Sequence, residues 1–171
     1  MTISMSSASL PVFKLTLGNL NHLLDKALAH AEAKKFDPSV LIQVRLAPDM
    51  LPFSTQVLIA CDSVKNGIAR LSGVEAPKFD DTEKTIPDLK ARIQKTLDYL
   101  DSVPADKLDG TEDKDITFPV GKDATRTMKG EAYLKHHMLA NFFFHVTMAY
   151  ALLRHNGVDV GKMDFLAGAR R

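Results

Sequence analysis

Apolar residues recur at intervals of three and four positions along four long stretches of the chain. This spacing places them on one face of an α-helix, so each stretch is predicted to be an amphipathic helix. The clearest stretch has its apolar positions at Ile86, Leu89, Ile93, Leu97 and Leu100. Thr85 and Asp88 have the spacing of a capping box at its start, and Pro104 predicts its end.

The first stretch predicts a long helix that ends near Ala33. Pro11 falls in its early part, where the missing N–H of proline costs little. A short helix from Ser39 to Arg45 is predicted next, and Pro48 closes it.

The remaining two long helices lie on either side of the middle of the chain. One contains the apolar positions from Val57 to Leu71, with Asp49 expected as its cap and a stop at Ser72-Gly73. The other runs from Gly130 to Asn156, and the pattern leaves open a break near Ala140.

A short alternating segment precedes the last helix. Its apolar positions are Ile116, Phe118 and Val120. Alternation of this kind before Gly121 predicts a small β-hairpin, and Pro119 restricts it to a sheet edge. No charged residue occurs from Met138 to Leu153, which predicts a helix at the centre of the fold. The predicted architecture is an all-α, antiparallel up-down four-helix bundle with a hairpin insertion, formed by residues 1–171 as a single domain.

Composition narrows the functional classes only slightly. The chain has 22 Lys and Arg against 21 Asp and Glu, which does not favour nucleic acid as a partner. The uncharged run is shorter than the ~20 residues that a membrane-spanning helix needs, so no membrane partner is expected. No secretory signal is evident, and the single cysteine, Cys61, suits a reducing compartment, so a cytoplasmic location is predicted.

His145 is the residue most in need of an explanation, because it lies within the uncharged run. Asn141 and His145 share one helical face one turn apart, which is a spacing that two ligands of a metal can have. The same histidine could instead be a core residue that hydrogen bonds to a partner, or a general base. His137 or Asp62 could assist it, although sequence does not constrain residues on different helices.

Three segments resemble a known group of proteins. They are LDKALAHAEAKKFDPSVLIQVRLAPDMLPFSTQV (residues 24–57), GVEAPKFDDTE (residues 73–83) and NFFFHVTMAYALLRHNGVDVGKMDFL (residues 141–166). The chain resembles the DinB-like (DinB/YfiT-like) superfamily, a group of four-helix bundles described as metalloenzymes. Within it, the similarity is to an uncharacterised bacterial branch known only as a domain of unknown function. Several members of the superfamily are homodimers, which leaves a homodimer open here.

The resemblance also assigns positions to a metal site. Members with a metal carry one histidine on the second helix and an HxxxH pair on the fourth, followed by an ending that LLRHNG resembles. His145 then corresponds to the second histidine of the pair, Asn141 to the first and Gln56 to the second-helix position. Two of the three donors are amides, which bind zinc or nickel weakly, so the expected cofactor is none or a weakly held divalent metal.

Two functional classes follow from these residues. In the first, the protein binds a small organic molecule in a cleft between the second and fourth helices, near Gln56, Asn141, His145 and His137. In the second, it is a metal-dependent enzyme in which His145 is a metal ligand or the general base. The resemblance implies a thiol transferase here, because some relatives are metal-dependent thiol transferases, with a hydrolase-like reaction as the alternative. The residues favour the first class slightly, because this chain has amides, Gln56 and Asn141, at two positions where the metal-binding members have histidines.

Overall fold

The computed structural model describes residues 3–121 and 123–168, and this part of the chain is mostly helical. Its four long helices are α1 (Leu10–Lys34), α3 (Phe53–Ser72), α4 (Ile86–Ser102) and α6 (Leu139–His155). The shorter elements are α2 (Ser39–Ile42), a 3₁₀ turn (Ala105–Lys107), β1 (Asp115–Val120), β2 (Ala124–Lys129), α5 (Gly130–Tyr133), a π-helical segment (Leu134–Met138) and α7 (Lys162–Ala167).

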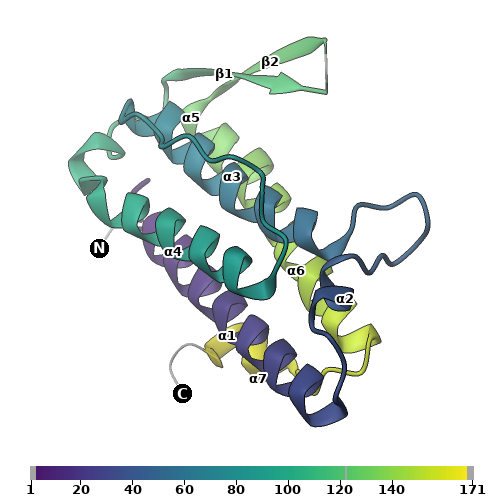
Figure 1. Cartoon of the computed structure of the whole chain (residues 1–171). Helices are drawn as coiled ribbons and strands as arrows, with labels where there is room; N and C mark the ends of the chain where they lie inside the picture. Colours follow the sequence, from purple (N-terminus) through teal and green to yellow (C-terminus); the bar gives the residue numbers. More distant parts are fainter. Residues whose placement is uncertain (1–2, 122, 169–171) are drawn as a thin grey trace.

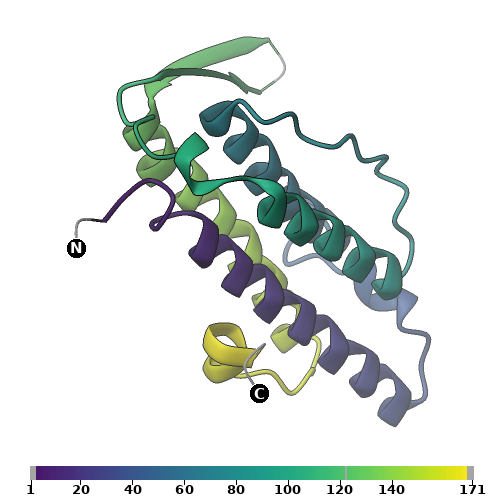
Figure 2. The same cartoon turned by 90° about the vertical axis from the view of Figure 1, so that its left-hand side faces the viewer.

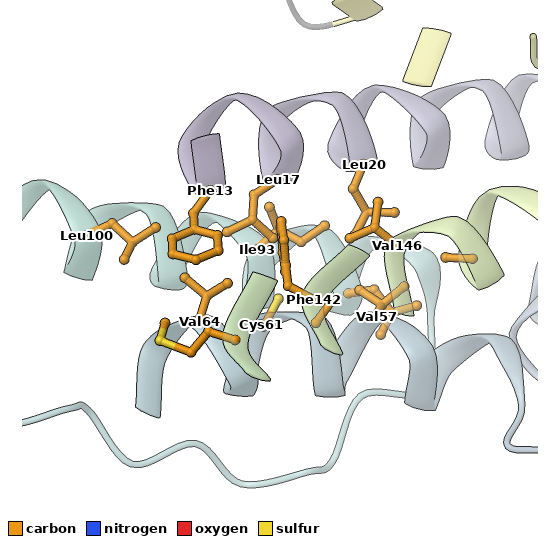
Figure 3. Packing of buried hydrophobic residues seen from close by; sticks show 14 of the residues in the cluster. Phe13, Leu17, Leu20, Val57, Cys61, Val64, Ile93, Leu100, Phe142 and Val146 are labelled. Atoms are coloured by element: carbon orange, nitrogen blue, oxygen red, sulfur yellow. The ribbon is translucent and has the colours of Figure 1, made fainter. Parts of the chain in front are cut away.

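The long helices surround one apolar core (Figure 1). Helix α3 packs against α6 and α4, while α1 packs against α4, α6 and the short α7. Figure 3 shows side chains of all four long helices meeting in the interior, among them Phe13 of α1, Val64 of α3 and Phe142 of α6. The rings of Phe13 and Phe142 meet edge to face with centroids 5.1 Å apart, so α1 and α6 contact each other through an aromatic pair.

Helix α4 begins as its sequence predicts. The Thr85 hydroxyl accepts a hydrogen bond from the Asp88 backbone N–H at 3.2 Å, and the Asp88 carboxylate accepts one from the Thr85 N–H at 2.9 Å. Asp49, by contrast, does not cap α3, because that helix begins four residues later at Phe53. The reason is Pro52, which disfavours helical backbone at Leu51 and so prevents the helix from extending back to Asp49.

The last helical stretch is continuous but contains one wider turn. The π-helical segment Leu134–Met138 joins α5 to α6 just before the position where a break was left open. Gly67 of α3 lies against it so closely that a Cβ there would be 2.3 Å from Cε of Met138. The prediction of a fully buried central helix is wrong, since Phe143 is 36% and Phe144 54% exposed on its outer face.

The hairpin covers one end of the helices (Figure 1). Strands β1 and β2 pair antiparallel with Thr117 opposite Thr127, and their hydroxyls lie 2.8 Å apart. Ile116 and Phe118 point inward from β1 and are buried, as the alternation predicts, whereas the third apolar position, Val120, is exposed. Since the sheet has two strands in the described part of the chain, Pro119 removes no hydrogen bond to a third strand there.

A loop formed by residues 73–85, here called the strap, runs alongside α4 (Figure 2). It is tied down by the guanidinium of Arg92, whose side chain is 1% exposed. Arg92 forms ion pairs with Glu83 at 3.0 Å and Asp81 at 3.1 Å from the strap, and with Asp62 of α3 at 2.9 Å. The guanidinium also lies 4.4 Å from the ring centre of Phe79, so charge and ring contacts both hold the strap.

The C-terminal helix α7 packs on α1 and was not predicted from the sequence (Figure 2). Asp164 accepts hydrogen bonds from the Gly161 N–H at 2.8 Å and from Lys26 at 3.2 Å, and it contacts His22 at 3.2 Å. None of the helices in the described ranges is long and apolar enough to cross a membrane.

Candidate functional site

His145 and Gln56 contact each other in the interior. Nδ1 of His145 lies 2.8 Å from Oε1 of Gln56, and both side chains are buried. Nε2 of Gln56 donates to the backbone carbonyl of Leu51 at 3.0 Å, which orients the amide with its oxygen toward the ring. An amide oxygen can only accept, so Nδ1 of His145 carries the proton and Nε2 does not.

Burial sets the charge state of His145. The residue is 7% exposed, and burial lowers the pKa of its imidazole below the ordinary 6.5. The ring is therefore neutral at pH 7, as a core histidine with one amide partner is expected to be. Helix α3 supplies the partner because it packs directly on α6.

Asn141 does not join this pair but lines a nearby cleft. The cleft has a volume of about 150 Å³ and lies between α3, the π-helical segment, the start of α6 and the hairpin. Its lining consists of Ile59, Asp62, Ser63, Asn66, Arg70, Phe118, Pro119, Tyr133, His137, Met138 and Asn141. The structure thus brings Asn141 and His137 to one cleft, while Gln56 and His145 meet outside its lining.

An aromatic cluster closes the end of the cleft under the hairpin. The rings of Phe118 and His137 have centroids 4.3 Å apart, and Tyr133 stacks on His137 at 5.5 Å. The Tyr133 hydroxyl accepts a hydrogen bond from Arg70 at 3.0 Å. Burial lowers the pKa of His137, and the positive charges of Arg70 and Arg126 lower it further, so this imidazole is also neutral at pH 7.

Polar groups of the cleft differ in whether they have partners. Neither the Asn66 nor the Asn141 side chain hydrogen bonds to any group within residues 3–121 and 123–168. The Asp62 carboxylate lies 3.0 Å from Nζ of Lys65 and 2.9 Å from Arg92. Asp62 therefore takes part in the ion pairs that hold the strap. The sequence left open that Asp62 assists a histidine, but within the described residues no hydrogen bond joins it to His145 or His137.

Cys61 lies in the core and takes no part in this chemistry. Burial raises the pKa of its thiol to about 12, so the reactive thiolate is scarce at neutral pH. Two further hollows, of about 290 and 910 Å³, lie beside the strap and are open to solvent. The smaller one is lined by Arg92 and Glu83, which already pair with each other.

The donors near His145 match a metal site poorly. Oε1 of Gln56 lies at hydrogen-bond distance from Nδ1 of His145, so these two atoms bond to each other and are not available as metal ligands. Asn141 would add a second amide to a site where zinc and nickel prefer imidazole nitrogen or thiolate. In the described part of the chain, no group of three or more His, Cys, Asp and Glu residues lies close enough to hold a metal ion.

Several cleft residues were not singled out from the sequence. Arg70, Tyr133 and Asn66 come together only because the hairpin folds over α3 and the π-helical segment. The available signal was that the polar residues Asn66 and Arg70 lie one turn apart on the same predicted helix. Neither residue is recognisable as functional without knowing which face of α3 adjoins the hairpin.

Comparisons with known proteins place the chain in a family. Residues 5–166 match the family described as a domain of unknown function, DUF1993. A solved structure of a DinB family member protein from Shewanella denitrificans is 40% identical, with a TM-score of 0.86; the match covers 95% of this chain and 91% of that one. Comparison with curated proteins finds no match. The chain therefore belongs to the DUF1993 family, and its resemblance to the DinB-like group is confirmed.

Proposed function

We propose that this protein is a DinB-like up-down four-helix bundle that binds a small polar organic molecule in the cleft between α3 and the last helical stretch. The observation that carries the proposal is a pair of amides, Asn66 and Asn141, that line this one cleft. Neither amide has a hydrogen-bond partner among the described residues. Such groups are available to a ligand, since a bound molecule would satisfy donors and acceptors that the fold leaves open.

The π-helical segment supports the same location. Its wider turn, Leu134–Met138, places His137 and Met138 in the cleft lining. Single π-helical turns cost hydrogen-bond geometry and are frequent at functional sites. The small cavity, about 150 Å³, is below the ~300–1,000 Å³ of pockets for drug-sized ligands, so the ligand has few heavy atoms.

In this proposal the metal site of the superfamily is degenerate. Gln56 and His145 form a buried hydrogen bond that joins α3 to α6, and Asn141 has become a ligand-binding group in the cleft. His145 then acts on the ligand indirectly, since it lies one helical turn from Asn141 and fixes the helix that carries it.

A fragment screen by two-dimensional NMR tests the proposal. We expect small polar molecules to shift the side-chain amide signals of Asn66 and Asn141 and the ring signals of His137. Asn141→Leu is expected to abolish these shifts while the thermal unfolding midpoint stays close to that of the wild type. The proposal fails if a broad panel of polar fragments produces no shift at the cleft, or if Asn141→Leu leaves binding unchanged.

The second candidate is an enzyme in which His145 is a general base. One observation favours it, namely that Nδ1 of His145 donates to Gln56 and leaves the lone pair on Nε2 free to accept a proton. A metal-dependent thiol transferase or hydrolase needs near-stoichiometric zinc or nickel in untagged protein, with loss of that metal in His145→Ala. Protein without bound metal, or metal that is unaffected by this substitution, excludes the metal-dependent form.

A further inference from the structure

Arg70 supplies an unpaired positive charge to the cleft. It lies in the last turn of α3, is half-buried and lines the cavity. Its Nη1 donates to the Tyr133 hydroxyl at 3.0 Å, which holds the guanidinium in place. Within residues 3–121 and 123–168, its remaining N–H groups have no acceptor and no carboxylate pairs with it. A positioned guanidinium with free N–H groups is suited to a carboxylate, which it can bind through two parallel hydrogen bonds.

The acidic residue in the described lining of the cleft, Asp62, does not pair with Arg70. Asp62 is the one acidic residue in the lining, and Lys65 and Arg92 lie 3.0 and 2.9 Å from it. The carbonyl groups at the end of α3 carry partial negative charge, but Nζ of Lys114 donates to the Arg70 carbonyl at 2.9 Å and offsets it. Among the described residues that line the cleft, the guanidinium of Arg70 is thus a cation that no carboxylate pairs with.

Part of the cleft wall is aromatic. Phe118 and the neutral ring of His137 lie with centroids 4.3 Å apart and form an apolar surface beside Arg70. A ligand with a planar apolar body could pack there, while the amides of Asn66 and Asn141 in the same lining remain available for hydrogen bonds.

We propose that the ligand of the cleft is a small organic carboxylate, with its carboxylate bound by Arg70 and its body placed against Phe118. This inference rests on the proposed function, because it names the ligand class of the same cleft. It goes further because it requires the ligand to carry a negative charge, whereas the unpaired amides alone would also accept a neutral ligand.

Benzoate and benzamide form a matched pair for the test, since they share size and shape and differ in charge. At constant ionic strength, we expect benzoate to bind the cleft at least about tenfold more tightly than benzamide, as one charge-assisted contact provides. Bound benzoate should also raise the pKa of His137, measured by NMR titration of its ring protons, because a nearby negative charge favours the imidazolium. Benzamide should leave that pKa unchanged.

Substitutions assign the effect to Arg70. Arg70→Met should lower benzoate affinity about tenfold and leave benzamide affinity as it is, whereas Arg154→Met, which removes an equal charge from the exposed end of α6, should change neither. If Arg70→Met does not fold, the comparison of benzoate with benzamide in the wild type decides alone.

The outcomes separate this inference from the proposed function. Equal affinities of benzoate and benzamide for the cleft would overturn the inference that the ligand is a carboxylate, and would leave the proposed function standing. Absence of binding by charged and neutral fragments alike would overturn both.

Discussion

At the scale of single residues, the hydrogen bond between His145 and Gln56 is the contact on which most of the functional argument depends. It joins two buried polar side chains from α3 and α6 at 2.8 Å, in a region that is otherwise apolar. Each side chain satisfies the other, so neither carries the full cost of burial. The same pairing removes both residues from the cleft, where the amide of Asn141 remains available.

Replacing Gln56 tests this pairing directly. Gln56→Leu leaves the Nδ1–H of His145 buried without an acceptor and should lower the free energy of unfolding by about 1–3 kcal/mol. Gln56→Glu keeps an acceptor and adds a negative charge, which should raise the pKa of His145 above its depressed wild-type value. Chemical denaturation and NMR titration of the ring measure the two effects.

Asn141→Leu is the matched control for Gln56→Leu. It removes the same amide group from a half-buried position without a partner in the described residues, so its effect on stability should stay within about 0.5 kcal/mol. Equal losses of stability for the two substitutions would show that the His145–Gln56 bond has no special role.

At the scale of elements, helix α7 depends on one carboxylate. The backbone N–H of Gly161, together with His22 and Lys26, lowers the pKa of Asp164 to about 2 against the effect of burial. These contacts attach a helix of 6 residues to α1. A helix that short is not stable alone, so its position is a consequence of tertiary contacts.

The pH dependence of α7 docking follows from this depressed pKa. Since the folded-state pKa lies below the usual 3.8, the contribution of Asp164 is fully present above about pH 4 and is lost as the pH falls toward about 2. Asp164→Asn should remove that dependence and lower the free energy of unfolding by about 1–3 kcal/mol at pH 7. The effect is measured as the protection of the α7 amides from hydrogen exchange, relative to the intrinsic exchange rate at each pH. Protection that does not change with pH in the wild type would contradict the prediction.

The π-helical segment is a second case in which one element depends on another. Gly67 lets α3 approach so closely that the side chain of Met138 occupies the space a Cβ would need. This close packing places the wider turn next to α3, where Tyr133 reaches Arg70 and His137 reaches Phe118. The shape of the cleft is therefore decided jointly by α3, the π-helical segment and the hairpin.

At the scale of the whole molecule, the strap closes one side of the fold through buried charge. Arg92 contacts two acidic residues of the strap and one of α3, and Lys65 of α3 lies 4.2 Å from the ring centre of Phe79 in the strap. A buried ion pair is not a large net source of stability, but removing one partner leaves uncompensated charge. The strap is thus expected to detach when Arg92 is lost.

Arg92→Met should lower the free energy of unfolding by about 3–5 kcal/mol, because Asp62 and Glu83 would lose their guanidinium partner. Amide hydrogen exchange in residues 73–85 should become faster at the same time. Asp81→Asn serves as the control, since the Asp81 side chain is 65% exposed and its loss should cost less than about 1 kcal/mol. Unchanged exchange in the strap of Arg92→Met would show that other contacts hold it.

Sequence alone determined the features that depend on local periodicity and local capping. The spacing of apolar residues predicted the long helices, Thr85 and Asp88 predicted the start of α4, and alternation around Phe118 predicted the hairpin. These predictions succeed because each depends on residues within a few positions of one another, which interact in the same way in most folds.

Tertiary structure decided the features that join distant segments. The cap of α3, the exposed face of α6 with Phe144, and helix α7 all depend on neighbours that the local pattern does not specify. The resemblance named Gln56, Asn141 and His145 together, but only the packing of α3 on α6 determines that two of them bond to each other while the third lines a cleft. Arg70 becomes a candidate for ligand binding for the same physical reason, since burial, partners and charge compensation are properties of the folded chain.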